Sequence, residues 1–284
     1  MLIRPRPDGF QAGSAVRHDV DERWLMAYAA GVRDTSSALF DLDRPGGIVA
    51  HPVFPVCVEW PLMRDGAVGL EFDDGDPAEG LHSGHEIRWH RPIRAGDRLF
   101  TRGRLRSVEQ KKSGVLAVVE LTTEDSAGEP VVETRETVFY LGAELDGDTT
   151  AAGKPSPPPS PEIAMEEIGA FQVSLLDAVV YGECARIYNP VHTDIRRARA
   201  AGLSEGPLLH GTATFARCVS LVVERMLGGD AESVARIGCR MAAPVPMPSR
   251  LTVSAGRSGE VVRFHARTGS GEDAITHGLL EPKA

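Results

Sequence analysis

The residues best suited to chemistry lie close together in the second half of the chain. His192 stands in the run Tyr188-Asn189-Pro190-Val191-His192-Thr193-Asp194, and Leu209-His210-Gly211 follows shortly after it. Histidine titrates near neutral pH, so His192 can transfer a proton or orient a water molecule. Gly211 stands at the predicted start of a helix, where its backbone N–H can donate to a carbonyl oxygen with no Cβ in the way. These two groups predict proton transfer beside a polarised carbonyl group.

The neighbours of these two groups are expected to shape the site. Asn189 can fix the loop, and Pro190 sets its turn. Tyr188 and His210 flank the site and are candidates for contact with a substrate. Arg196 is a candidate for binding phosphate, because a guanidinium fork matches phosphate oxygens, but a solvated basic face explains it equally well.

One segment divides the chain into two predicted units. Residues 144–161 are small, acidic or proline for the most part, which cannot form a hydrophobic core, so they predict an interdomain linker. The linker separates an N-terminal unit, residues 1–143, from a C-terminal unit, residues 162–284, which carries the site. A chain of 284 residues is long enough for two such domains.

Similar landmarks recur in the two units in the same order. Tyr28 corresponds to Tyr181 and His51 to His210, at offsets of 153 and 159 residues. We interpret this order as a tandem duplication. A histidine that is repeated at both helix starts favours a structural role, which lowers the expectation that His210 takes part in chemistry.

Each unit is expected to place a helix before a series of strands. The helices are predicted at residues 53–63 and 211–226, the second with apolar residues at helical spacing. The strands are predicted at residues 85–89, 98–108, 115–123 and 131–141, and again at 233–241, 250–255, 260–266 and 274–280. One long helix against about four antiparallel strands, twice over, is an α+β fold in which the sheet wraps the helix.

The pattern of the second unit resembles the MaoC-like family of (R)-specific enoyl-CoA hydratases and dehydratases. That family combines Asn-Pro-x-His, here residues 189–192, with a His-Gly helix start, here residues 210–211. The repeated layout is similar to its double hot-dog members. The resemblance implies that each half-sheet wraps a helix, that the two sheets pair side by side, and that a coenzyme A thioester binds where the halves meet.

The same resemblance implies a lyase that needs no cofactor. Its substrate would be an acyl-CoA or acyl-carrier thioester, either a 2-enoyl thioester that is hydrated or a 3-hydroxyacyl thioester that is dehydrated. His192 would act as the acid/base and Gly211 as the oxyanion donor. The fused repeats already supply one pseudo-dimer interface, so a homodimer is allowed but not required.

One position departs from the family pattern. The family has an aspartate five residues before the histidine, and Ile187 stands there. Glu183 can replace it if the segment is extended, because residues 183 and 187 then share a face, although a surface role suits Glu183 better. Asp194 is a second candidate, and Asp34 of the first repeat, opposite Ile187 in the alignment, is a remote third.

The presence of Ile187 is also explained if the site catalyses a different reaction or none. The site then belongs to a catalytically silent module that binds acyl thioesters, or to a hot-dog thioesterase. Thermal stabilisation by acyl-CoA without turnover identifies the silent module, and release of free thiol identifies the thioesterase.

Composition and charge exclude several other functions. The formal net charge is −9 and charges of both signs are mixed, so nucleic acid and anionic membranes are poor partners. No apolar run has the length of a signal or membrane span, which predicts a cytoplasmic protein. The four cysteines are widely spaced and predict free thiols. His82 and His85 face opposite ways on a regular strand, so no metal site is expected there, and His90 does not complete a zinc motif.

Overall fold

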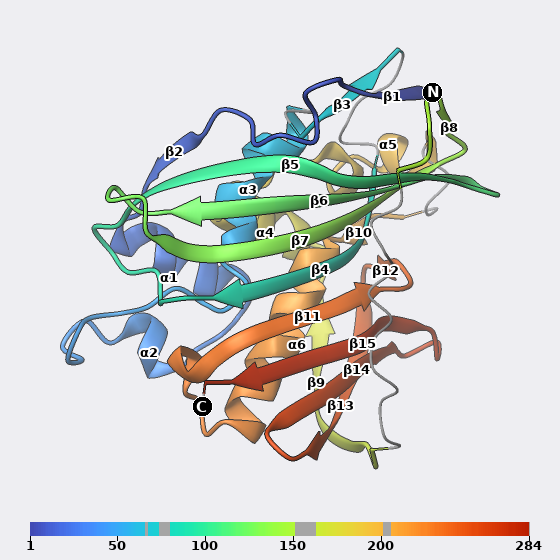
Figure 1. Cartoon of the computed structure of the whole chain (residues 1–284). Coiled ribbons are helices and arrows are strands. Elements are labelled where there is room, and N and C mark those ends of the chain that lie inside the picture. The colour runs from blue at the N-terminus through green and yellow to red at the C-terminus, as the bar shows by residue number, and fades with distance from the viewer. Residues whose placement is uncertain (66–67, 74–79, 151–162, 201–205, 284) are drawn as a thin grey trace.

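A ten-stranded antiparallel sheet runs through the molecule in the order β2-β5-β6-β7-β4-β11-β15-β14-β13-β9. The structure is a computed structural model, and it describes all residues except 66–67, 74–79, 151–162, 201–205 and 284. Figure 1 shows the first five strands curving over α3 and the last five curving over α6. This is the α+β double hot-dog arrangement that the sequence predicts.

The N-terminal half contributes five strands to this sheet. They are β2 (Val16–Asp19), β4 (Leu81–Trp89), β5 (Arg98–Lys111), β6 (Gly114–Glu124) and β7 (Pro130–Leu141). Buried and half-buried residues alternate along β6, because successive side chains of a strand point to opposite faces. A smaller sheet lies at one end, formed by β3 (Leu70–Phe72), β1 (Leu2–Pro5) and β8 (Glu144–Leu145).

The C-terminal half repeats this layout. Its strands are β9 (Glu166–Val173), β11 (Val234–Met241), β13 (Ser249–Ser258), β14 (Val261–Thr268) and β15 (Asp273–Pro282). The halves join where β4 pairs with β11, with Ile87 opposite Ile237. Both side chains are fully buried, so the core continues across the join. A short pair, β10 (Leu208–Leu209) with β12 (Val245–Pro246), and the turn η3 (Ala231–Ser233) complete this half.

Each half-sheet packs on one central helix. α6 (Gly211–Met226) buries Phe215, Val219 and Val222 completely, and its bounds match the predicted residues 211–226. α3 (Pro55–Arg64) begins with proline, which suits the first turn of a helix. Within the described residues, none of the helices combines the length and apolar character needed to cross a membrane.

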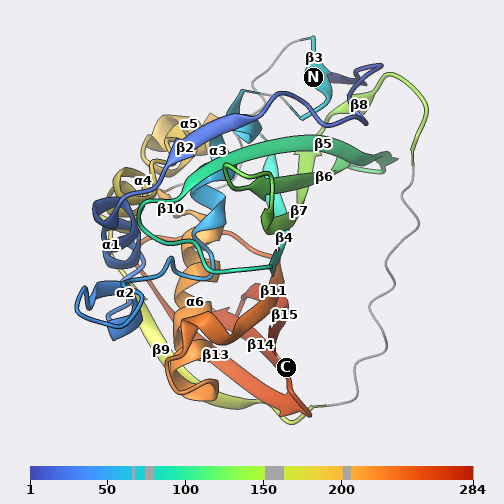
Figure 2. The ribbon, with the colours of Figure 1, turned by 60° about the vertical axis from the view of Figure 1, so that its left-hand side comes forward.

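A third layer of helices covers the outer side of the central pair, as Figure 2 shows. It includes α1 (Glu22–Gly31), α2 (Ser37–Phe40), α4 (Asp177–Ala185) and α5 (Ile195–Ala200). α1 and α4 pack against each other so closely that a Cβ on Gly31 would lie 2.8 Å from Cβ of Cys184. Tyr28 and Tyr181, the first pair of equivalent residues in the predicted repeat, contact each other there, with 6.0 Å between their ring centroids.

Part of the predicted linker belongs to the N-terminal half. β8 pairs in parallel with β1, with Leu145 opposite Ile3, and Thr150 bridges to Val108. Ile3 is fully buried, so this packing orders the start of the segment assigned to residues 144–161. The segment predicted as a linker therefore begins with a short strand, and its residues 151–161 lie outside the described residues.

Candidate active site

A short turn presents His192. The side-chain Oδ1 of Asn189 accepts a hydrogen bond from the backbone N–H of Val191 at 3.2 Å. Pro190 is the first residue of the 3₁₀ helix η2 (Pro190–His192), where its fixed φ suits the turn. This geometry agrees with the loop-fixing roles expected of Asn189 and Pro190, and it leaves His192 half-buried at the end of the turn.

The imidazole of His192 is oriented by β10. Its Nδ1 lies 3.2 Å from the carbonyl oxygen of Leu208. Because a carbonyl oxygen only accepts hydrogen bonds, Nδ1 carries the proton and Nε2 keeps a lone pair. Burial lowers the pKa of His192 to about 4, so the ring is neutral at pH 7. The site therefore holds a neutral imidazole whose Nε2 can accept a proton.

His210 lies directly against His192. Their ring centroids are 3.8 Å apart and their planes meet at 29°. His210 is buried and also contacts Tyr181, with 5.0 Å between ring centroids. Burial, followed by the neighbouring His192, lowers the pKa of His210 well below its usual value. His210 is thus a neutral, buried platform on which the ring of His192 rests.

The helix α6 begins beside these two rings. Gly211 is its first residue and directly follows His210. A Cβ on Gly211 would lie 2.6 Å from Sδ of Met241, so the missing side chain lets α6 approach β11 closely. The first N–H groups of a helix have no partner within it, and the helix dipole favours negative charge there. Gly211 therefore combines close packing with an N–H suited to an oxyanion.

Ile187, which stands where the family pattern has an aspartate, is an apolar and buried residue. Ile187 is 5% exposed, and its backbone N–H bonds the carbonyl of Gly182 at 2.9 Å. It follows Arg186, which ends α4 in the left-handed region with φ +59°. In the part of the chain that the structure describes, histidines within ion-pair distance of a carboxylate are His51, His82, His85 and His90. His192 has no such partner among these described residues.

Glu183 does not occupy the place expected for a substitute acid. It lies on α4 and not on an extended segment, so the reason for placing residues 183 and 187 on one face is wrong. Its side chain is exposed and accepts a hydrogen bond from the hydroxyl of Tyr188 at 3.3 Å. Tyr188 is itself 53% exposed. The pair lies on the surface beside the His192 turn.

Asp194 is committed to the neighbouring helix. Its carboxylate accepts from the backbone N–H of Arg196 at 2.9 Å and from two guanidinium nitrogens of Arg196 at 2.7 and 3.0 Å. These bonds lower the pKa of Asp194 to about 2. Asp194 thus stabilises the start of α5 and stays ionised, while Arg196 keeps 87% of its side chain exposed.

The first half holds the complementary set of residues. Asp34 is the structural equivalent of Ile187. Each residue follows an arginine with a positive φ, and the backbone N–H of each donates to the carbonyl oxygen of the residue five positions earlier. Its Oδ2 lies 3.6 Å from Nε2 of His51, which also lies 3.0 Å from Oγ of Ser220. The position equivalent to His192 is the buried Leu39. Asp34 therefore faces the histidine of its own half.

Two family models match the chain, one in each half. Residues 9–134 match a FAS1-like dehydratase domain region, and residues 164–279 match a MaoC like domain. The second match contains His192 and Gly211.

Curated relatives match with low identity. Peroxisomal multifunctional enzyme type 2 of Mus musculus is 23% identical over 257 residues, covering 89% of this chain and 34% of that protein. Enoyl-CoA hydratase ChsH3 of Mycobacterium tuberculosis is 32% identical over 117 residues, which is 40% of each protein. The matches therefore cover less than half the length of these relatives.

Solved structures share the whole fold. A MaoC-like dehydratase from Phytophthora capsici matches with a TM-score of 0.78 at 20% identity, covering 97% of this chain and 98% of that one. A Mycobacterium tuberculosis protein described as a double hot-dog fold matches with a TM-score of 0.64 at 16% identity, covering 98% and 97%. These likenesses show the double hot-dog fold over the whole chain, and the family models find a FAS1-like dehydratase domain region in its first half and a MaoC like domain in its second.

Proposed function

We propose that the protein is a lyase that reversibly hydrates a 2-enoyl-CoA thioester, or dehydrates the corresponding 3-hydroxyacyl thioester. The observation that carries this proposal is the neutral His192, which the carbonyl of Leu208 holds through Nδ1 so that Nε2 keeps its lone pair, beside the start of α6 at Gly211. The relative that is named an enoyl-CoA hydratase supports it. The exposed Tyr188 and Arg196 are the proposed contacts for the coenzyme A part.

A single base is sufficient for this reaction. In hydration, Nε2 of His192 takes a proton from water while the water oxygen bonds to the β carbon. The electrons of the double bond move toward the thioester carbonyl, whose oxygen accepts a hydrogen bond from the N–H of Gly211. The imidazolium then returns its proton to the α carbon and the carbonyl re-forms. One water is added, both new bonds form on the face next to His192, and dehydration is the reverse.

This one-base mechanism predicts an unusual pH dependence. The neutral imidazole is the active form, so kcat/KM should fall as pH drops through the His192 pKa of about 4, and stay level from pH 5 to 8. The free energy of unfolding should change in the same direction. Its contribution from His192 is fully present above pH 6.5, the pKa of an unfolded histidine, and is lost as the pH falls toward 4, the pKa in the folded state. Initial rates and circular dichroism across this range test both, and an activity limb near 6.5 contradicts the prediction.

Replacing Ile187 by aspartate should increase activity. The new carboxylate stands where the family has its second acid/base, so kcat/KM is expected to rise by about 10-fold or more, up to about 10²-fold. Ile187→Asn is the matched control, since asparagine has the size and polarity of aspartate but no charge. Unchanged activity in a correctly folded Ile187→Asp variant contradicts the proposal that position 187 is the place of the family's second acid/base group.

The assay that tests the proposal follows the conjugated thioester absorbance of crotonyl-CoA and of longer enoyl-CoA substrates. Loss of absorbance with formation of the 3-hydroxyacyl product is the expected result. The buried Ile187 favours one other function, a catalytically silent module that binds acyl thioesters. Acyl-CoA would then raise the Tm without turnover, and that result would replace the proposed lyase.

A further inference from the structure

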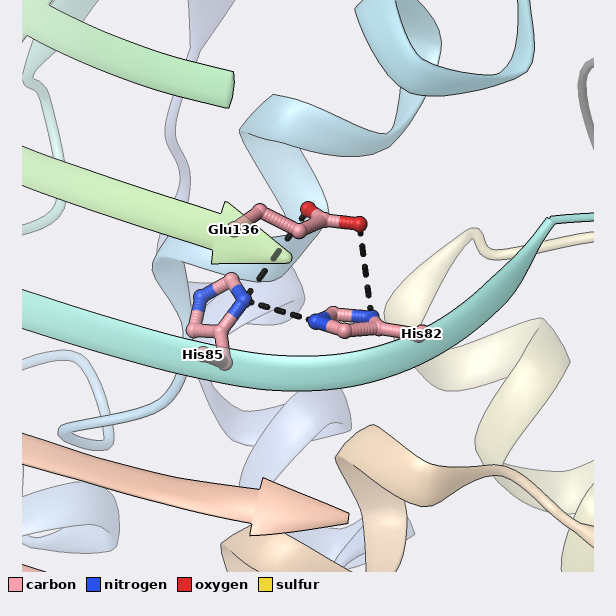
Figure 3. A group of neighbouring side chains, drawn as sticks. All are labelled: His82, His85 and Glu136. Atoms are coloured by element: carbon pink, nitrogen blue, oxygen red, sulfur yellow. Dashed lines mark hydrogen bonds and ion pairs between the residues drawn. The ribbon is translucent and has the colours of Figure 1, made fainter. Parts of the chain in front are cut away.

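A second cluster of ionisable groups lies beneath the N-terminal half-sheet. His82 and His85 come from β4 and Glu136 comes from β7, as Figure 3 shows. The Nε2 of His82 lies 3.0 Å from Nδ1 of His85, and Oε2 of Glu136 lies 3.9 Å from that same Nδ1. One atom from each of the three residues falls within 4.8 Å of the others. The cluster is separate from the His192 site.

A β-bulge explains why the two histidines meet. The pairing of β4 with β7 shifts between His82 and Gly84, so that Ser83 is an extra residue in β4. One extra residue turns the side chains that follow it to the other face. His82 and His85, which a regular strand would direct to opposite sides, therefore point to the same side. The expectation from the sequence that these two histidines face apart is wrong for this reason.

The rings of His82 and His85 share a hydrogen bond, but the side of the cluster next to α3 lacks hydrogen-bond partners among the described residues. His85 is 2% exposed and Glu136 is 6% exposed. Glu59, on α3, is 1% exposed, and neither of its carboxyl oxygens has a hydrogen-bond partner in the described part of the chain. The Nε2 of His85 also lacks one there. Buried polar groups without partners destabilise a fold, so this arrangement points to a bound ligand.

We propose that His82, His85 and Glu136 bind one divalent transition-metal ion, for which Zn²⁺ is the probe. Two imidazoles and a carboxylate are ligands that such ions prefer. With metal–ligand bonds of about 2.0–2.2 Å, tetrahedral ligands lie about 3.3 Å apart, close to the separations found around Nδ1 of His85. Three protein ligands leave one coordination position for water.

Glu59 gives this site its orienting partner. When His85 binds metal through Nδ1, its Nε2 carries the proton and lies 3.5 Å from Oε2 of Glu59, so a small shift of either side chain completes a hydrogen bond. Metal-bound histidines nearly always donate their second ring N–H to a carboxylate, a backbone carbonyl or water. The two carboxylates, Glu59 and Glu136, also balance the charge of a dication. The side chain of His82 is 25% exposed and connects the cluster with the surface.

Metal loading of the whole chain tests this proposal. Protein treated with a chelator and then supplied with Zn²⁺ should retain one equivalent after desalting, and its Tm should rise by about 5–10 °C at excess metal. His85→Gln and His82→Gln should lose the equivalent and the shift. His90→Gln is the matched control, because His90 forms a half-exposed pair with Glu133 at 3.6 Å and should keep both. Zn²⁺ retention by His85→Gln equal to wild type overturns the proposal.

Glu59→Gln should affect metal binding less than the histidine variants do. It should keep the stoichiometry but weaken Zn²⁺ affinity by about 10–100-fold. If the histidine variants fail to fold, Co²⁺ bound to the unaltered protein gives the answer. Intense visible bands of four-coordinate Co²⁺ that Zn²⁺ displaces support the site, whereas the weak spectrum of hydrated Co²⁺ contradicts it.

Discussion

Replacing His192 by alanine should lower kcat/KM for enoyl-CoA hydration by about 10²–10⁴-fold without unfolding the protein. The imidazole supplies both proton transfers of the proposed mechanism, and no carboxylate among the described residues forms an ion pair with it. His192 is half-buried in a surface turn, so removing its ring leaves the core intact. Initial rates with crotonyl-CoA, with circular dichroism to verify the fold, give the measurement.

His90→Ala is the control for this variant. His90 is an exposed histidine after the end of β4 and should leave kcat/KM unchanged. Full activity in His192→Ala would show that another group moves the protons. In that event Glu183, which lies on the surface with Tyr188, becomes the first residue to replace.

Replacing Arg217 by methionine should destabilise the protein by about 3–5 kcal/mol. Asp177, the first residue of α4, is 1% exposed, and its Oδ2 accepts from Nη1 of Arg217 on α6 at 2.7 Å. Hydrogen bonds from Arg217, Ser174 and Arg33 outweigh burial and hold the pKa of Asp177 well below its usual value. Without Arg217, a buried carboxylate would lose its buried countercharge. Urea unfolding at pH 7 measures the change.

Arg33→Met is the matched control, because Arg33 bonds the same carboxylate at 2.6 Å but is 60% exposed. An exposed ion pair contributes little, so this variant should lose less than about 1 kcal/mol. Equal losses in both variants would contradict the view that burial decides the effect. The low pKa of Asp177 also makes stability depend on pH. The carboxylate stabilises the fold at any pH above the pKa of an unfolded aspartate, and this stabilisation disappears as the pH falls through the lower pKa of the folded protein.

The elements whose patterns arise from burial could be predicted from the sequence. The bounds of α6 follow from its apolar spacing, and β6 alternates as a strand with one buried face should. The sequence does not predict the helices α1 and α4, since their stability comes from packing on each other. The strand β8 was assigned to the linker because two residues carry no periodicity, and its partner β1 is distant in sequence.

The candidate site was predictable only where a motif specifies it. The run from Asn189 to His192 indicates a fixed turn, which the hydrogen bond from Val191 to Asn189 provides. The stacking of His210 on His192 depends on how the turn meets α6, and no spacing encodes that contact. The cluster around His85 was excluded because a regular strand was assumed. A single bulge at Ser83 reverses that conclusion, and the sequence signal for it is Gly84, because an isolated glycine within a strand favours a bulge.

The most direct test of the central claim is a structure of the protein with a bound 3-hydroxyacyl-CoA or a non-reactive enoyl-CoA analogue. In that structure the thioester oxygen should lie about 2.7–3.1 Å from the backbone nitrogen of Gly211. We also expect Nε2 of His192 to lie within about 2.6–3.2 Å of the β-hydroxyl group. A thioester bound away from Gly211, or a β carbon that approaches a carboxylate while His192 stays apart, would contradict it.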